Sequence, residues 1–135
     1  MTNKIIILLL IVFSLPSCFN EEGEGGSSTI VGDVIVQQKI SNPVLGIVDS
    51  VIAEYPSVED RVYIKYGDNE IYDDEFRTDE AGRFKFEFLR KGDYTIFVYS
   101  PCDSCDTEIQ ALYQTITVDK NREEYEVPTF FIDPE

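Results

Sequence analysis

Residues 78–98 read TDEAGRFKFEFLRKGDYTIFV, and this stretch decides the fold. Within it, apolar side chains alternate with polar ones, which is typical of a strand with one buried face; the apolar positions are Phe84, Phe86 and Phe88 and the polar ones Arg83, Lys85 and Glu87. Residues 94–99 are apolar on both faces, which predicts a central strand covered on two sides. The Asp- and Gly-containing segments 78–82 and 90–93 predict tight turns between antiparallel neighbours.

Other segments with period-two alternation extend this pattern along the chain. Val62, Ile64 and Tyr66 alternate with Arg61, Tyr63 and Lys65. Further strands are predicted near residues 30–38, 71–77, 112–118 and 124–131. Seven short strands in about 100 residues indicate an all-β, antiparallel, Greek-key-like sandwich.

The quoted stretch resembles a known family, the carboxypeptidase regulatory-like domain, which is a transthyretin-like sandwich related to Cna B-type repeats. The family pattern T-D-x-x-G-x-F-x-F is matched by residues 78–86, and L-x-x-G-x-Y-x-[VI] by residues 89–96. Gly32-Asp33-Val34 also resembles the first strand of the family. The resemblance implies a seven-stranded prealbumin-like fold over residues 29–135, and it implies little about activity because one fold serves many functions.

The segment from Asn42 to Asp60 is longer than the usual link between the first two strands of that family. Residues 44–52 read VLGIVDSVI, which is too apolar for an ordinary exposed loop. We expect this segment to cover a sheet edge or to form an extra strand or short helix. If it is exposed, it is the best candidate for a partner-binding patch.

The N-terminal residues 1–17 have the features of a bacterial signal peptide. Lys4 precedes an unbroken apolar run of nine residues, 5–13, which is too short to cross a bilayer as a helix. The junction Leu15-Pro16-Ser17-Cys18 resembles a lipobox, so we expect cleavage before Cys18 and lipidation of its thiol. Residues 18–28 are polar and rich in Gly and Ser, and we expect them to form a flexible tether.

The composition restricts the partners and the chemistry. The chain has 26 acidic and 11 basic residues, a net charge of −15, and its charge becomes −16 if Lys4 leaves with the signal peptide. This charge opposes binding to nucleic acid or to anionic lipid headgroups. The chain contains no His, the commonest general base and metal ligand. We therefore expect no catalytic residues, no cofactor and no metal site.

Three clusters remain as candidate sites. Cys102 and Cys105 are spaced for a loop-stapling disulfide in an oxidising compartment, with a redox role as the alternative. The acidic run at residues 68–75 offers oxygen ligands to calcium, although its spacing is not that of an EF-hand and favours a solvated hairpin. Tyr63, Tyr72 and Tyr113 have the chemistry to stack on sugars, with cross-strand packing as the default interpretation.

Taken together, these features predict a lipid-anchored lipoprotein of the bacterial outer membrane, displayed on the cell surface. Its sandwich is expected to serve as a non-catalytic binding, display or accessory module that contacts an envelope protein or a surface ligand. One alternative is an adhesin or pilus-type subunit assembled through strand edges near residues 127–131. A second alternative is a CxxC thiol–disulfide protein.

Overall fold

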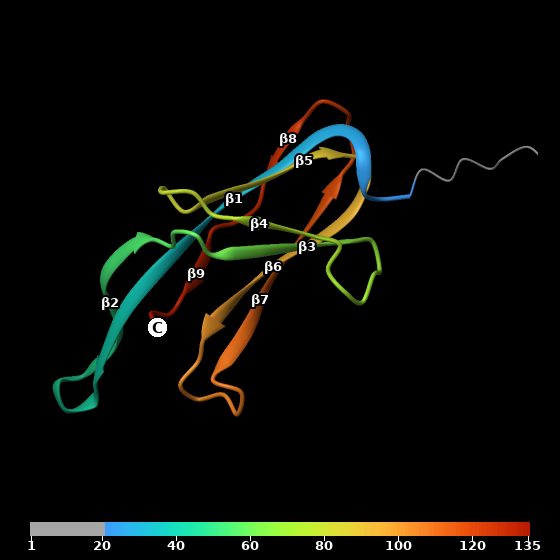
Figure 1. Ribbon diagram of the computed structural model, residues 1–135. Helices are drawn as coiled ribbons and strands as arrows, with labels where there is room; N and C mark the ends of the chain where they lie inside the picture. The colour runs from blue at the N-terminus through green and yellow to red at the C-terminus, as the bar shows by residue number, and fades with distance from the viewer. Residues whose placement is uncertain (1–20) are drawn as a thin grey trace, which may run out of the picture.

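The computed structural model describes residues 21–135, so the predicted signal peptide and Cys18 lie outside the described residues. Residues 21–135 form nine strands and one short 3-10 helix (Figure 1). The elements are β1 (Glu24–Asn42), η2 (Pro43–Leu45), β2 (Ile47–Pro56), β3 (Arg61–Tyr66), β4 (Asp74–Arg77), β5 (Arg83–Leu89), β6 (Gly92–Pro101), β7 (Ile109–Val118), β8 (Glu124–Glu126) and β9 (Phe130–Ile132). The expected all-β class is confirmed.

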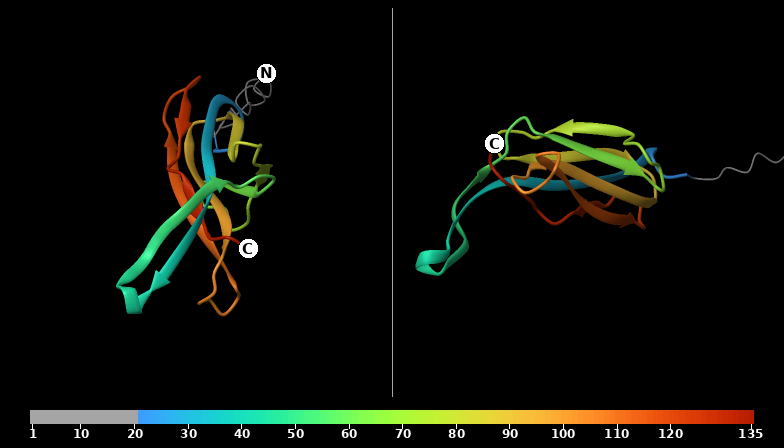
Figure 2. Two further views of the ribbon diagram at one scale, coloured as in Figure 1. Left: turned by 90° about the vertical axis from the view of Figure 1, so that its left-hand side faces the viewer. Right: turned by 90° about the horizontal axis from the view of Figure 1, so that it is seen from below.

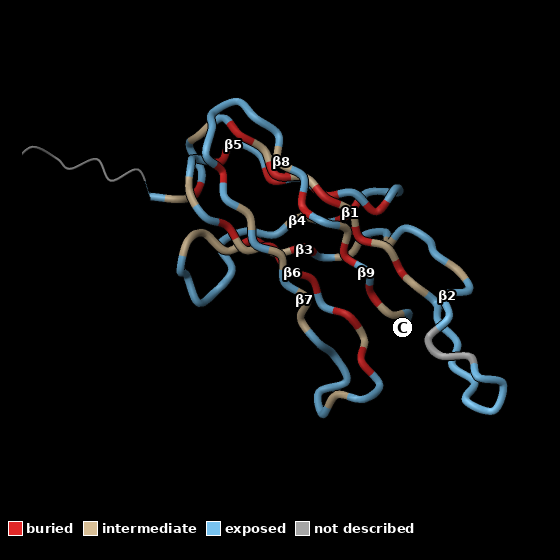
Figure 3. Tube along the Cα trace, turned by 180° about the vertical axis from the view of Figure 1, so that it is seen from behind, coloured by how far each residue is buried: buried red, intermediate tan, exposed pale blue. Residues whose placement is uncertain are grey.

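The strands form two sheets that pack face to face (Figure 2). One sheet has the order β2-β1-β5, with β8 and β9 also paired to β1, and the other has the order β4-β3-β6-β7. Alternate side chains from both sheets fill the space between them, as period-two strands require. The core includes Ile30, Val34, Val62, Ile64, Phe84, Phe86, Tyr94, Ile96, Val98 and Phe130. Figure 3 shows these buried stretches along the middle of the strands.

The strand count and directions differ from the expected seven antiparallel strands. Both β8 and β9 run parallel to β1, so the first sheet is mixed. The single strand expected near residues 124–131 is split in two, and Pro128, which has no N–H to donate to a sheet, lies in the gap. The segment expected at 71–77 enters the sheet only at Asp74. The transthyretin-like strand order is therefore not established by this count.

The turn at residues 78–82 does not close a hairpin as expected, because it carries the chain from β4 in one sheet to β5 in the other. Thr78 is buried at the crossing, where its hydroxyl donates to the carbonyl oxygen of Ser57 (2.6 Å) and accepts from the N–H of Asp60 (2.9 Å). Gly82 has φ +76°, and a Cβ there would lie 2.5 Å from a backbone oxygen. The turn near residues 90–93 likewise joins β5 to β6 across the sandwich.

Phe88 is the one aromatic residue of β5 that departs from the predicted alternation. Phe84 and Phe86 are buried as expected, but Phe88 is 68% exposed. Its φ of +59° turns the side chain outward, and Leu89 takes the core position in its place. The register between β5 and β1 shifts at the same point, which is the signature of a bulge.

The expected tether over residues 18–28 is wrong from Glu24 onward, because β1 begins there. Ser28 is buried, and its hydroxyl donates to the carbonyl oxygen of Lys120 at 2.7 Å. A Cβ at Gly26 would lie 2.0 Å from the carbonyl oxygen of Leu89, so this position has room only for glycine. Gly26, which suggested flexibility, instead allows the close approach of two backbones.

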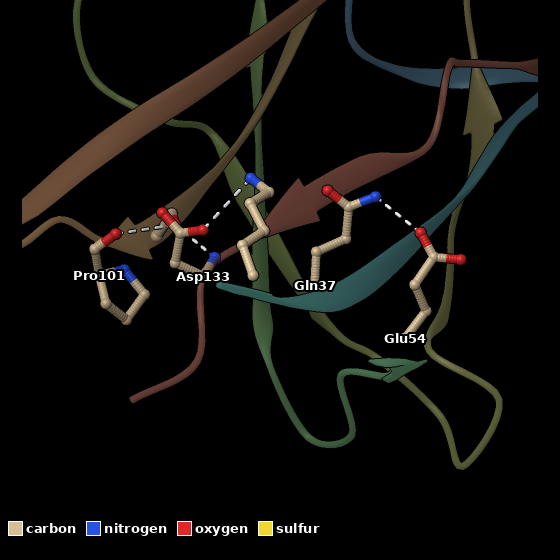
Figure 4. Close-up of polar contacts among 6 residues, drawn as sticks. Gln37, Glu54, Pro101 and Asp133 are labelled. Carbon is tan, nitrogen blue, oxygen red and sulfur yellow. Dashed lines mark hydrogen bonds and ion pairs between the residues drawn. The ribbon is translucent and has the colours of Figure 1, made fainter. Parts of the chain in front are cut away.

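The segment Asn42–Asp60 contains both the extra strand and the short helix that we expected, η2 and β2. Together with the second half of β1 it forms a two-stranded arm that projects beyond the sandwich (Figures 1 and 2). The arm is exposed rather than edge-covering, and Val44 at its tip is 92% exposed. Two polar contacts hold its base (Figure 4): Gln37 Nε2 donates to Glu54 Oε1 at 2.7 Å, and Lys39 Nζ lies 3.4 Å from Asp133 Oδ1.

Candidate ligand-binding face

The outer face of the four-stranded sheet carries a cluster of aromatic side chains. Along β6, Tyr94, Ile96 and Val98 point into the core, so Phe97 and Tyr99 point to the opposite side. Phe97 is only 6% exposed, although no second layer covers this face among residues 21–135. Its cover comes from aromatic neighbours on its own sheet. The expected central position of this strand is confirmed, and the cover on its second side is a row of rings rather than another element.

The sheet register places three of these rings in one row. Tyr63 on β3 is opposite Phe97, and Phe97 is opposite Tyr113 on β7. The ring centroids of Tyr63 and Phe97 are 5.0 Å apart in a stacked arrangement, and those of Phe97 and Tyr113 are 5.4 Å apart. Tyr99 meets both Tyr63 and Phe97 edge to face, at 5.7 and 5.8 Å. Tyr72, from the β3–β4 loop, lies 4.8 Å from Tyr63.

We call these five residues, Tyr63, Tyr72, Phe97, Tyr99 and Tyr113, the aromatic face. Each ring contact within it stabilises the sheet by roughly 0.5–1.5 kcal/mol beyond simple burial. The outer rings nevertheless remain open to solvent, since Tyr72, Tyr99 and Tyr113 are 47%, 45% and 57% exposed. The rings therefore form a rigid surface with both apolar area and free hydroxyl groups.

Charged side chains surround the aromatic face. Arg61 and Lys65 flank Tyr63 at alternate positions of β3, so they share its side of the sheet. Lys65 Nζ lies 5.6 Å from the ring centroid of Tyr113, a distance suited to a cation–π contact. Hydrogen bonding to Tyr63, followed by the charge of Glu75, raises the pKa of Arg61. The guanidinium of Arg61 is thus a permanent cation at the border of the rings.

The sequence identified three of the five aromatic residues. Tyr63, Tyr72 and Tyr113 lie on one face and show the predicted packing of rings, and Tyr72 and Tyr113 are also exposed enough to contact a ligand, whereas Tyr63 is partly buried. Phe97 and Tyr99 were missed as members of this group. The sequence of residues 94–99 contained the information needed, because a strand that is apolar on both faces must place some of its apolar side chains outside the core.

Cys102 and Cys105 form the expected disulfide, with their Cα atoms 5.4 Å apart. The pair lies in the loop between β6 and β7, where the N–H of Cys102 donates to the carbonyl oxygen of Glu108 at 2.9 Å. A reactive dithiol of the thioredoxin kind places its first cysteine at a helix N-terminus, and this pair follows a strand instead.

The acidic segment at residues 68–75 is organised by its own hydrogen bonds. Asp73 accepts from the backbone N–H of Tyr66 at 2.7 Å and from the amide of Asn69 at 2.8 Å. Within the described part of the chain, no three potential metal ligands converge on one point. Residues 68–73 of this segment belong to the β3–β4 loop, which positions Tyr72 against Tyr63, and Asp74 and Glu75 begin β4.

Comparisons with known proteins give a structural likeness and no match in sequence. No protein-family model and no curated protein matches the chain. Among solved structures, the chain is similar to a candidate carbohydrate-binding protein from Pseudomonas aeruginosa, with a TM-score of 0.48, 16% sequence identity, and coverage of 83% of this chain and 91% of that one. A likeness at this level carries no conclusion about the function of this chain. Across residues 21–135, none of the helices reaches the length and apolarity that crossing a bilayer demands.

Proposed function

We propose that this protein is a non-catalytic binding module of a bacterial cell envelope, held to the membrane by a lipid on Cys18, and that the aromatic face is its ligand-binding surface. The observation that carries the proposal is the set of three half-exposed tyrosines grouped on a sheet face that no other element covers within residues 21–135. An exposed group of large apolar side chains on a soluble domain is characteristic of interaction sites.

Tyrosine suits this role for physical reasons. Its ring supplies a large contact area while having only two rotatable side-chain bonds, so little conformational entropy is lost on binding. On the aromatic face the rings also restrain one another, which lowers this entropic cost further. The hydroxyl groups of Tyr99 and Tyr113 can donate and accept hydrogen bonds at the edge of the apolar surface. Ligands with alternating apolar and hydroxyl-bearing surfaces, such as sugars, match this arrangement.

The lipid anchor is supported by the signal-peptide features of residues 1–17 and by the lipobox-like junction before Cys18. Only Phe19 and Asn20 separate Cys18 from the described residues. The chain from Cys18 to Glu21 can therefore span about 10 Å at most. With Cys18 lipidated, the sandwich would lie close to the membrane. We also propose that residues 29–135 belong to the carboxypeptidase regulatory-like family and have its transthyretin-like topology, on the strength of the sequence patterns at residues 78–96.

Binding is tested by probing a glycan array with the full chain and with a Tyr99→Ser, Tyr113→Ser double variant. The matched control is Tyr55→Ser, Phe131→Ser, because those two rings are similarly exposed on the other sheet. We expect the wild type and the control to retain the same glycans and the aromatic-face variant to lose them. Equal binding by all three proteins would disprove the assignment of this face.

The anchor is tested separately by labelling cells with a radioactive fatty acid. We expect the wild type to incorporate the label and Cys18→Ala to lose both the label and its membrane fractionation. Protease treatment of intact cells then distinguishes display on the outer surface, where the domain is cleaved, from a periplasmic location, where it is protected.

Assembly through strand edges is a second candidate function, and the exposed arm favours it. β2 pairs only with β1 among the described strands, so its other edge is free to accept a strand from a partner. The last strand, β9, is less suited than the sequence suggested because it has only three residues, against ten in β2, and so offers a much shorter edge. A monomer at high protein concentration, measured by analytical ultracentrifugation, would exclude self-assembly through β2.

A further inference from the structure

Basic side chains slightly outnumber acidic ones beside the aromatic face, whereas acids predominate in the rest of the protein. Among residues 21–135 there are 26 acidic and ten basic side chains. On the outer face of the four-stranded sheet, Arg61, Lys65 and Arg77 accompany two acids, Glu75 on β4 and Asp93 on β6. At physiological ionic strength charges act over about 8 Å, so a ligand on this face responds mainly to these local groups.

Within residues 21–135, two of these cations make no direct ion pair, although the charge of Glu75 acts on Arg61. Among the described residues, neither Arg61 nor Lys65 lies within ion-pair distance of a carboxylate, whereas Arg77 lies 4.0 Å from Glu59. The exposed basic residues of β5 behave differently: Arg83 is 3.6 Å from Asp33, and Lys85 is 3.1 Å from Glu87. In a chain with a large excess of acids, two unpaired cations beside exposed rings are available to a ligand.

Two nearby carboxylates accept hydrogen bonds from other groups of the protein. Asp73 accepts from Tyr66 and Asn69 inside the β3–β4 loop. Asp93, at the start of β6, accepts from the hydroxyl of Thr117 at 2.5 Å. Neither carboxylate lies within ion-pair distance of Arg61 or Lys65, although both keep their negative charge.

We infer that the aromatic face binds an acidic polysaccharide, a chain of sugar rings that bear carboxylates; this inference rests on the proposed function. The planar guanidinium of Arg61 matches a carboxylate in two-point geometry. Lys65, placed beside the ring of Tyr113, adds a second cation next to the apolar surface that a sugar ring would contact. The row Tyr63–Phe97–Tyr113 crosses three strands, roughly 10 Å, and so accommodates more than one sugar unit.

The low charge density of such a polymer also limits its repulsion by the acidic surface of the protein. Duplex nucleic acid carries one charge about every 1.7 Å, and the acidic surface beyond the face would repel it strongly. A polyuronide carries one carboxylate per sugar ring, so only a few charges approach the protein at once. These can be met by the cations of the aromatic face.

The test uses affinity electrophoresis of the full chain through gels that contain polygalacturonate or its fully methyl-esterified form. Esterification keeps the sugar rings and removes the charge, which makes the pair a matched probe. One protein variant carries both Arg61→Gln and Lys65→Gln. The control variant carries both Arg83→Gln and Lys85→Gln, which remove the same charges from the other sheet. Circular dichroism melting confirms that each variant is folded.

We expect polygalacturonate to retard the wild type at least tenfold more strongly than the esterified polymer does, and we expect the Arg61, Lys65 variant to lose that retardation while the control keeps it. Equal retardation by both polymers, lost in Tyr99→Ser, Tyr113→Ser, would overturn the acidic-ligand inference and leave the binding function intact. Retardation by polyglutamate as strong as by polygalacturonate would assign the face to an acidic peptide and overturn the polysaccharide. No retardation in any gel, together with no glycan-array binding, would overturn both proposals.

Discussion

The hydroxyl of Tyr94 lies 2.9 Å from the backbone nitrogen of Gly23, although the two residues are 71 positions apart in the chain. Tyr94 is buried in β6, and its hydroxyl accepts from Gly23 while donating to the carbonyl oxygen of Arg90 at 2.8 Å. Burial is the main reason that the pKa of Tyr94 is raised. One phenol group thus fastens the start of the described chain to the turn between β5 and β6.

Tyr94→Phe removes the hydrogen bonds to Gly23 and Arg90 and leaves the size of the core nearly unchanged. The variant should be less stable by about 1–3 kcal/mol, because the buried N–H of Gly23 loses its acceptor. Urea unfolding measures the change, and amide exchange should show faster opening at residues 21–26. Tyr113→Phe, which removes an exposed hydroxyl, is the control and should unfold like the wild type. Equal stability of the two variants would contradict this role for Tyr94.

Thr78→Val should destabilise the crossing between the sheets by about 1–3 kcal/mol. Valine has the same shape but leaves the carbonyl oxygen of Ser57 and the N–H of Asp60 without the hydroxyl that now satisfies both. Thermal unfolding measures the difference, with Thr115→Val on the exposed face of β7 as the control. A loss no greater than that of the control would show that water replaces the hydroxyl at this site.

Phe88→Asn should stabilise the protein by up to about 1 kcal/mol. Asn tolerates the left-handed backbone that Phe88 adopts, with φ +59°, better than a bulky residue does. Because the side chain is exposed, little packing is lost. Urea unfolding measures the gain. A clear loss of stability would mean that the exposed ring of Phe88 makes contacts that stabilise the folded protein.

Asp79 makes stability depend on pH in a defined direction. Backbone hydrogen bonds from Arg83 and Ala81 lower its pKa in the folded protein, so the folded state binds its proton less readily than the unfolded state does. The resulting stabilisation is present above the unfolded pKa, near 4, and is lost as the pH falls through the lower folded pKa. Asp79→Asn should therefore melt at a lower temperature than the wild type at pH 7, and this difference should shrink as the pH falls below the unfolded pKa. A difference that is independent of pH would rule out the charge of Asp79 as its source.

The sequence predicted the fold class because the alternation of residues 78–98 reports directly on which side chains are buried. It could not predict how the turns connect the strands. Thr78 and Gly82 are ordinary hairpin residues by composition, and the contacts of Thr78 with Ser57 and Asp60 come from a part of the chain about 20 residues away. The outward turn of Phe88 has the same origin, since it depends on a register shift against β1.

The residue types of the candidate site were also predictable from the sequence, whereas their arrangement in space was not. Exposed tyrosines in alternating strands were visible in the sequence, but their convergence depends on the register that aligns Tyr63, Phe97 and Tyr113. The unpaired state of Arg61 and Lys65 is also invisible in composition. A net charge of −15 suggests an acidic surface everywhere, and only the positions of the strands show where it is not acidic.

β1 also determines how the protein would respond to mechanical load. This one strand of 19 residues begins beside the end that leads to Cys18 and finishes at the tip of the arm, a contour of roughly 60 Å. A partner that pulls on the arm tip against an anchored N-terminus would draw β1 along its own axis. Its hydrogen bonds to β2, β5, β8 and β9 lie across that direction, so they would be sheared together rather than unzipped one by one. The rate of forced unfolding would then be low, and the domain could stay folded while tension passes from its outermost point to the membrane.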